Sequence, residues 1–129
     1  NNEDAIADFT RAIRIDPDYV DAYVNRGIAY ANSGNREDAI ADYTRAIRID
    51  PDYVDAYSNR GIAYANLENY EDAIADYTRY LIRNPDDATI YNYRGLAKYR
   101  AGFDGCSDVM KAKKLGYRVH PDALKAICD

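Results

Sequence analysis

The chain has 129 residues, of which 47% are hydrophobic and 30% charged, the normal balance of a soluble folded protein. Its formal net charge of -5 argues against a nucleic-acid binder, because phosphate contacts need clustered Lys and Arg. No apolar run approaches the ~20 residues of a membrane-spanning helix, so we expect no membrane insertion.

A repeat of 34 residues runs through the chain and predicts its organisation. The segment VDAYVNRGIAYAN at 20–32 returns at 54–66 with one change, and EDAIADYTR occurs at both 37–45 and 71–79. Each unit contains two stretches with helical apolar spacing, which indicates a pair of helices per repeat. Small and helix-ending residues recur at the same step: Pro17, Pro51, Pro85, Gly27, Gly61 and Gly95.

Residues 1–17 match only the second helix of a repeat, with Asn1 as its expected N-cap and Pro17 after its end. A helix that would pair with it is absent, which leaves an apolar face uncovered. We expect the chain to be a fragment of a longer array. The alternative is that another copy covers this face, giving end-to-end association.

Two full repeats are predicted at 18–51 and 52–85. The small residues Gly27 and Ala39 stand where the two helices of the first pair would pack most closely, and tyrosines would fill the flanking space. The prolines end the second helices, because the ring lacks an amide proton and clashes with the preceding turn. The expected N-caps are Asp18 and Asp52 for the first helices, and Asn35 and Asn69 for the second.

Residues 86–116 form a third, altered repeat with a turn one or two residues shorter. Tyr80 stands where the pattern has a small residue, and Gly105 lies near an expected Ala, so we predict that Tyr80 fills the gap left by Gly105. In the remaining segment, 117–129, apolar residues fall on one face of a predicted helix at 121–128. A terminal repeat needs a cap with a polar outer side, which this helix would supply.

This pattern resembles the tetratricopeptide repeat family. The first helix has an aromatic, a small residue and a tyrosine in order, and the second has alanine, an aromatic, alanine and proline: Tyr23, Gly27, Tyr30, Ala39, Tyr43, Ala46 and Pro51. The resemblance covers residues 1–116. It implies an all-α, right-handed superhelical solenoid of antiparallel helix pairs, here closed by a C-terminal capping helix.

The resemblance also implies a concave groove, lined by the inner faces of the first helices, that receives an extended peptide. Asn25 and Asn59 are its strongest candidates, since an amide both donates and accepts as a peptide backbone does. The alternative is that both bond within their own helices. Tyr93 takes the third such position and would stack on a ligand side chain. The other groove candidates are Asp21, Val24, Ile28, Asn32, Asp55, Ser58, Ile62, Asn66, Thr89, Asn92, Leu96 and Arg100.

A carboxylate clamp of the kind that chaperone co-factors use is excluded, because its basic positions hold residues such as Val24 and Ile28. Arg26, Arg60 and Arg94 recur beside each glycine, and the sequence favours pairing with Asp42 and Asp76 over binding of a phosphate. His120 is the only histidine and precedes a proline, which favours a turn residue. With no catalytic constellation, we expect neither an enzyme nor a cofactor.

The two cysteines, Cys106 and Cys128, are too few for a zinc site. They would lie nearly opposite each other across the last hairpin. A disulfide there would place the protein in an oxidising, extracytoplasmic compartment, whereas two buried thiols would suit the cytoplasm, our default.

We therefore expect a protein-binding scaffold whose groove holds an extended, neutral-to-basic segment of another protein. The alternative is a structural module that self-assembles through its N-terminal helix and has no peptide ligand. A third option is that the repeats form an arm attached to an enzyme.

Overall fold

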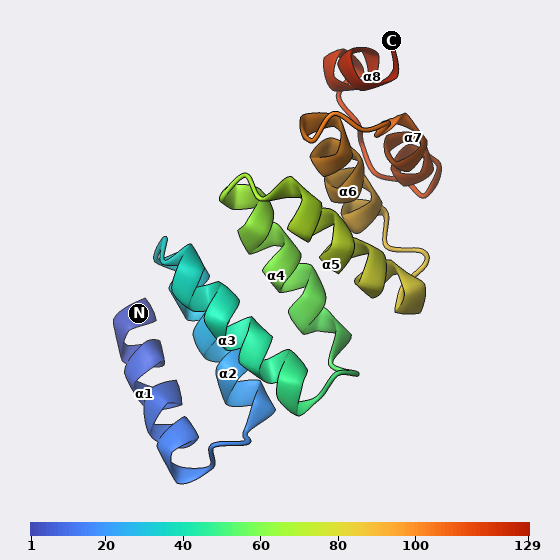
Figure 1. Ribbon diagram of the computed structural model, residues 1–129. Coiled ribbons are helices and arrows are strands. Elements are labelled where there is room, and N and C mark those ends of the chain that lie inside the picture. Colours follow the sequence, from blue (N-terminus) through green and yellow to red (C-terminus); the bar gives the residue numbers. More distant parts are fainter.

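The computed structural model describes all 129 residues, and it consists of eight α-helices with no strand (Figure 1). The all-α prediction is confirmed. Short turns join the helices, so successive helices alternate in direction along the solenoid. Their bounds are α1 (Asn2–Ile15), α2 (Val20–Asn32), α3 (Arg36–Ile49), α4 (Val54–Asn66), α5 (Tyr70–Arg83), α6 (Ala88–Arg100), α7 (Cys106–Lys114) and α8 (Pro121–Cys128).

The helices pack in pairs, and the pairs stack side by side. Helix α2 packs on α3, α4 on α5, and α6 on α7, while α1, α3 and α5 each contact the first helix of the next pair. The first helices also approach one another, α2 to α4 and α4 to α6, and the second helices have no comparable approach. The stack therefore curves with its first helices on the inner, concave side.

Glycine allows the two helices of a pair to come close. A Cβ added to Gly27 would lie 2.6 Å from Cε1 of Tyr43, and one added to Gly61 would lie 2.8 Å from Cε1 of Tyr77. The tyrosine ring thus occupies the space that a side chain would need. Tyr43 and Tyr77 are only 2% and 1% exposed, and the alanine in the facing turn, Ala39 or Ala73, is fully buried.

The prolines follow the ends of α1, α3 and α5 as predicted. Three of the five predicted N-cap positions are confirmed: Asn1, Asn35 and Asn69. Asn1 does accept a hydrogen bond from the Asp4 amide at 2.9 Å. Asn35 and Asn69 stand at the N-cap positions without a side-chain cap bond, because their backbones are not fully extended, with ψ of 71° and 69°. The expected caps Asp18 and Asp52 lie outside the helices.

Tyrosines hold the N-cap positions of α2 and α4 instead. Tyr19 precedes α2 and Tyr53 precedes α4. The aspartate before Pro17 or Pro51 organises the turn: the Asp16 carboxylate accepts from the Asp18 amide at 3.1 Å, and Asp50 from Asp52 at 3.0 Å. This local bond holds the acidic residues in the turn, away from the helix start.

A recurring arginine network ties three helices together in each repeat. Arg60 on α4 donates two hydrogen bonds to Asp76 on α5, at 2.9 and 2.8 Å, and a third to Thr44 on α3 at 3.2 Å. Arg26 and Arg94 do the same one repeat before and after, with partners Asp42, Thr10, Asp108 and Thr78. These hydrogen bonds raise the pKa of all three arginines. The structural interpretation of these arginines is confirmed.

The third repeat packs differently from the prediction for Tyr80. A Cβ on Gly105 would overlap the carbonyl oxygen of Gly95, so backbone of α6 fills the space beside Gly105. Tyr80 therefore does not fill that gap. It packs beside the core of α5 and α6 and donates a hydrogen bond to Asp87 at 2.7 Å, and Asp87 caps α6. The prediction is wrong because it overlooked this backbone contact.

The C-terminal helix α8 has no fully buried residue, and it occupies the residues predicted for the capping helix. Its attachment includes a disulfide between Cys128 at its end and Cys106 at the start of α7, with Cα atoms 4.8 Å apart. The His120 ring accepts from the Asp122 amide at 3.1 Å, so His120 is the N-cap of α8. No helix combines the length and the apolar character needed to cross a membrane.

Candidate peptide-binding groove

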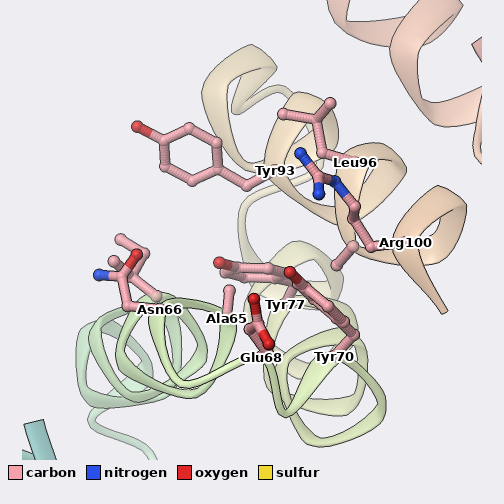
Figure 2. Close-up of a pocket in the computed structure, with 10 residues that line it drawn as sticks. Ala65, Asn66, Glu68, Tyr70, Tyr77, Tyr93, Leu96 and Arg100 are labelled. Atoms are coloured by element: carbon pink, nitrogen blue, oxygen red, sulfur yellow. The ribbon is translucent and has the colours of Figure 1, made fainter. Parts of the chain in front are cut away.

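The concave face carries a pocket of about 560 Å³ between α4 and α6, with α5 beneath it (Figure 2). Three tyrosines contribute aromatic surface, and Glu68 and Arg100 contribute opposite charges. Tyr77 and Tyr93 approach with ring centroids 6.3 Å apart and a tilt of 48°. The lining residues are Ile62, Ala65, Asn66, Glu68, Tyr70, Tyr77, Tyr93, Leu96, Ala97 and Arg100.

A second, smaller pocket of about 180 Å³ lies one repeat earlier, between α2 and α4. All nine of its lining positions are those of the larger pocket minus 34, so the two are repeats of one surface feature. The chemistry differs, because Asn59 and Arg36 stand where the larger pocket has Tyr93 and Tyr70. The lining residues are Ile28, Ala31, Asn32, Arg36, Tyr43, Asn59, Ile62, Ala63 and Asn66.

Several residues predicted for the groove line these pockets, and they come from all three first helices. Ile62 and Asn66 on α4 border both pockets, so the two are adjacent along the same face. The pocket-lining members of the predicted set are Ile28, Asn32, Asn59, Ile62, Asn66, Tyr93, Leu96 and Arg100. Asp21, Asn25, Asp55 and Thr89 are exposed but line neither pocket.

Three of the predicted residues lie beneath the groove surface. Val24, Ser58 and Asn92 hold the same position in successive repeats and are only 3%, 8% and 7% exposed. Val24 packs with the buried Ala46 and Ala56, and the Ser58 hydroxyl donates to the Asp55 carbonyl at 3.0 Å. This position turns toward the neighbouring repeat, so these side chains form the interface between repeats and do not line the groove.

The second helices contribute pocket residues that the sequence argument missed. Tyrosines are predicted to fill the space beside the close helix contact, and the rings of Tyr43 on α3 and Tyr77 on α5 are indeed buried there. Yet Tyr43 lines the smaller pocket and Tyr77 the larger one. The sequence carries no signal for this double role, because burial of a ring and exposure of its end depend on neighbouring helices.

The hydroxyl groups of these two tyrosines have no protein partner. The Tyr23 and Tyr80 hydroxyls donate to groups within the chain, whereas those of Tyr43 and Tyr77 do not. No fully buried side-chain oxygen lacks a partner, so both hydroxyls reach the surface in their pockets. Burial raises the pKa of Tyr43 to about 12, and burial likewise raises that of Tyr77. Both stay protonated at neutral pH and can donate.

The fold and the repeated groove define a helical-repeat solenoid. A family model described as TPR repeat matches residues 1–34 and 32–68, and one described as tetratricopeptide repeat matches 54–87. The chain therefore belongs to the tetratricopeptide repeat family. Members of this family are generally non-enzymatic, and the family assigns the chain a protein-interaction role as a scaffold.

Similar solved structures show the same fold. One is a crystal structure of MamA protein, with 24% sequence identity and a TM-score of 0.83. The alignment covers 93% of this chain and 70% of the MamA chain. Another is MamA 41-end from Desulfovibrio magneticus RS-1, with 22% sequence identity and a TM-score of 0.87. That alignment covers 89% of this chain and 66% of the MamA chain. No protein with a curated description matches the sequence.

Proposed function

We propose that the concave face binds an extended segment of another protein along α2, α4 and α6. The observation that carries the proposal is the pair of adjacent pockets on this face, built from equivalent residues one repeat apart. A ligand that runs along the face would meet a similar surface at each repeat. An extended chain has this regularity, whereas a globular surface generally does not.

The spacing of the repeats suits an extended chain. Packed helices lie about 8–10 Å apart, and an extended segment rises about 3.1–3.3 Å per residue. About three ligand residues would therefore pass from one first helix to the next. A polyproline-type segment has three residues per turn, so its side chains at i and i+3 would face the two pockets together.

Amide side chains on this face supply donors and acceptors for the ligand backbone. Asn59 lines the smaller pocket, Asn66 borders both, and Asn25 is exposed one repeat before Asn59. We assign Asn25 and Asn59 to hydrogen bonds with peptide groups of the ligand. The net charge of -5 modestly favours a neutral-to-basic segment.

The test is a double substitution, Asn25→Ala with Asn59→Ala, compared with wild type in pull-downs and in titrations of the captured partner. We expect binding to weaken at least tenfold, because two peptide groups of the ligand lose their partners, while circular dichroism stays unchanged. The matched control is Asn35→Ala with Asn69→Ala. These residues have the same spacing but make no cap bond and line neither of the two pockets. An equal loss of binding affinity in both double variants would contradict the proposal.

A second candidate, self-assembly through α1, is favoured by the exposure of Asp8. The equivalent carboxylates of Asp42 and Asp76 are 7% and 6% exposed in their arginine pairs, whereas the Asp8 side chain is 71% exposed. A second copy that covered this face would bury Asp8. Light scattering over a concentration series tests it, and a monomer at every concentration would exclude this role.

A further inference from the structure

The two pockets differ in what they can accept, although they occupy equivalent positions. The larger one presents the rings of Tyr70 and Tyr93 together with Ile62 and Leu96, above the buried ring of Tyr77. Figure 2 shows Tyr77 lying between Asn66, on α4, and the α6 side chains. Aromatic and aliphatic surface of this kind gains most by covering another apolar group.

The smaller pocket has less aromatic surface and more amide groups. Asn59 replaces one tyrosine and Arg36 another, and Asn32 and Asn66 add further amides. Its volume of about 180 Å³ is a third of that of the larger pocket. A short or polar ligand side chain fits there, whereas a bulky apolar one would desolvate several amides without replacing their hydrogen bonds.

Each pocket has the same polar group at its floor. Tyr43 and Tyr77 are 2% and 1% exposed, and their hydroxyls have no partner in the protein. A hydroxyl fixed by a buried ring loses little freedom when it donates a hydrogen bond to a ligand. The acceptor that an extended peptide offers at every residue is its backbone carbonyl.

The charges at the larger pocket do not select an ionic side chain. Glu68 and Arg100 both line it, so a ligand carboxylate or ammonium would meet one favourable and one unfavourable charge. Both residues are also exposed, which leaves their charges screened by solvent. The apolar surface therefore decides what the pocket takes.

We propose that the pocket between α4 and α6 is the specificity site for one bulky apolar side chain of the extended ligand. In this arrangement the Tyr77 hydroxyl donates to a backbone carbonyl of the same segment. The pocket between α2 and α4 takes a short or polar side chain about three residues away, with Tyr43 in the equivalent role. This proposal rests on the groove binding proposed above and adds the chemistry of its ligand.

The experiment is a selection of displayed peptides, ten random residues long, on the full chain. We expect enriched peptides to share one Phe, Leu, Trp or Tyr about three residues from a short or polar residue, and to lose binding to the Asn25→Ala, Asn59→Ala variant. Enrichment that needs the two asparagines but shows no bulky apolar position would overturn the specificity site and leave groove binding intact. No enrichment, or enrichment insensitive to the asparagines, would overturn both.

Exchanging the residues at one equivalent position of the two pockets provides a matched pair of variants. Tyr93→Asn gives the larger pocket the residue of the smaller one, and Asn59→Tyr does the reverse. We expect Tyr93→Asn to weaken a selected peptide roughly tenfold to a hundredfold, and much less when the bulky residue of that peptide is replaced by Ala. Equal weakening of both peptides would indicate a structural effect and overturn the assignment.

The hydroxyl is tested without changing the packing. Tyr77→Phe and Tyr43→Phe keep the rings, and no protein hydrogen bond is lost in either case. We expect each to leave thermal unfolding unchanged and to weaken the selected peptide about two- to tenfold. A peptide that binds both variants as it binds wild type would remove the hydroxyls from the proposal.

Discussion

The second and third repeats show how one packing problem is solved with different residues. In the second, Gly61 makes room for the Tyr77 ring, and Ala73 is buried in the facing turn. In the third, Val109 stands in place of the tyrosine, and Gly105, the N-cap of α7, lets the backbone at the start of this helix touch α6 at Gly95. The smaller side chain is offset by a closer approach of the two helices.

The arginine network is the same in both repeats although the connection between helices changes. Arg60 and Asp76 are 16 residues apart, and Arg94 and Asp108 are 14 apart. The contact has been kept while the turn became two residues shorter, as the sequence predicts. The repeat therefore preserves side-chain contacts more strictly than it preserves its own length.

The third repeat also adds connections that the second lacks. Lys98 contacts Asp108 at 3.0 Å, so this carboxylate faces two cations. The disulfide joins α7 to α8. A regular repeat gains support from its neighbours on both sides, and the additional links in the third repeat stabilise the C-terminal part of the stack.

The largest expected difference between the repeats comes from removing the arginines. Arg60→Met leaves Asp76, which is 4% exposed, without a cation and should cost about 3–5 kcal/mol. Arg94→Met should cost less, about 1.5–3 kcal/mol, because Lys98 still contacts Asp108. Hydrogen exchange resolved by helix is the measurement, since a solenoid does not unfold as one unit. Equal losses would show that Lys98 does not compensate.

Reduction of the disulfide should affect only the end of the third repeat. Its cysteines are 22 residues apart, and opening a loop of this size costs about 3 kcal/mol by chain entropy. Because α8 has no fully buried residue, we expect its amides to lose protection while α4 and α5 keep theirs. The control is the Cys106→Ser, Cys128→Ser variant, which reductant should leave unchanged. Mass spectrometry of the unreduced protein establishes the bond itself.

Substituting alanine for Gly105 or Gly61 should distinguish a glycine that contacts backbone from one that contacts a side chain. Gly105→Ala collides with the carbonyl of Gly95 and should cost about 3 kcal/mol, the upper end for overpacking. Gly61→Ala meets the edge of the buried Tyr77 ring, a side chain that yields more readily than backbone, and gains about 1 kcal/mol in helix propensity, so it should cost less. The difference in Tm between the variants checks this. A larger loss for Gly61→Ala would reverse our account.

The smallest effect is the response of the two carboxylates to acid. The ordinary pKa of an aspartate side chain is 3.8, and burial raises the pKa of Asp76 above it. Burial also acts to raise the pKa of Asp108, but the cations Arg94 and Lys98 outweigh it and lower this pKa. The ionised Asp108 carboxylate stabilises the fold at pH values above the ordinary pKa. This stabilisation is lost as the pH falls through the lower pKa that Asp108 has in the folded state. Asp76 loses none on acidification, because its folded state binds the proton more readily. Carboxyl carbon NMR titrations should therefore show Asp76 protonating first, and the reverse order would contradict this.

The helices could be predicted well and the groove only in part. Helical spacing predicts each helix, since one face must be apolar wherever it packs. Capping could be predicted only in part, because the Asp16 and Asp50 turns bond locally and Asn35, although at the N-cap position, is not extended enough to form the cap bond. For the groove, the position of Val24 was misjudged because one residue along a helix turns a side chain by about 100°. That is enough to move it from the groove into the interface between repeats.

The sequence by itself determined the repeat, the helices it encodes and the arginine pairs, because periodicity and charge pairing are local or recur at a constant step. Only the tertiary structure decided the pockets, the buried position of Val24, Ser58 and Asn92, and the role of Gly105. Each of these depends on how closely neighbouring helices approach, which is set by several side chains acting together. Tyr77 combines both aspects: its burial follows from the repeat, but the access of its hydroxyl to the groove follows from the curvature of the stack.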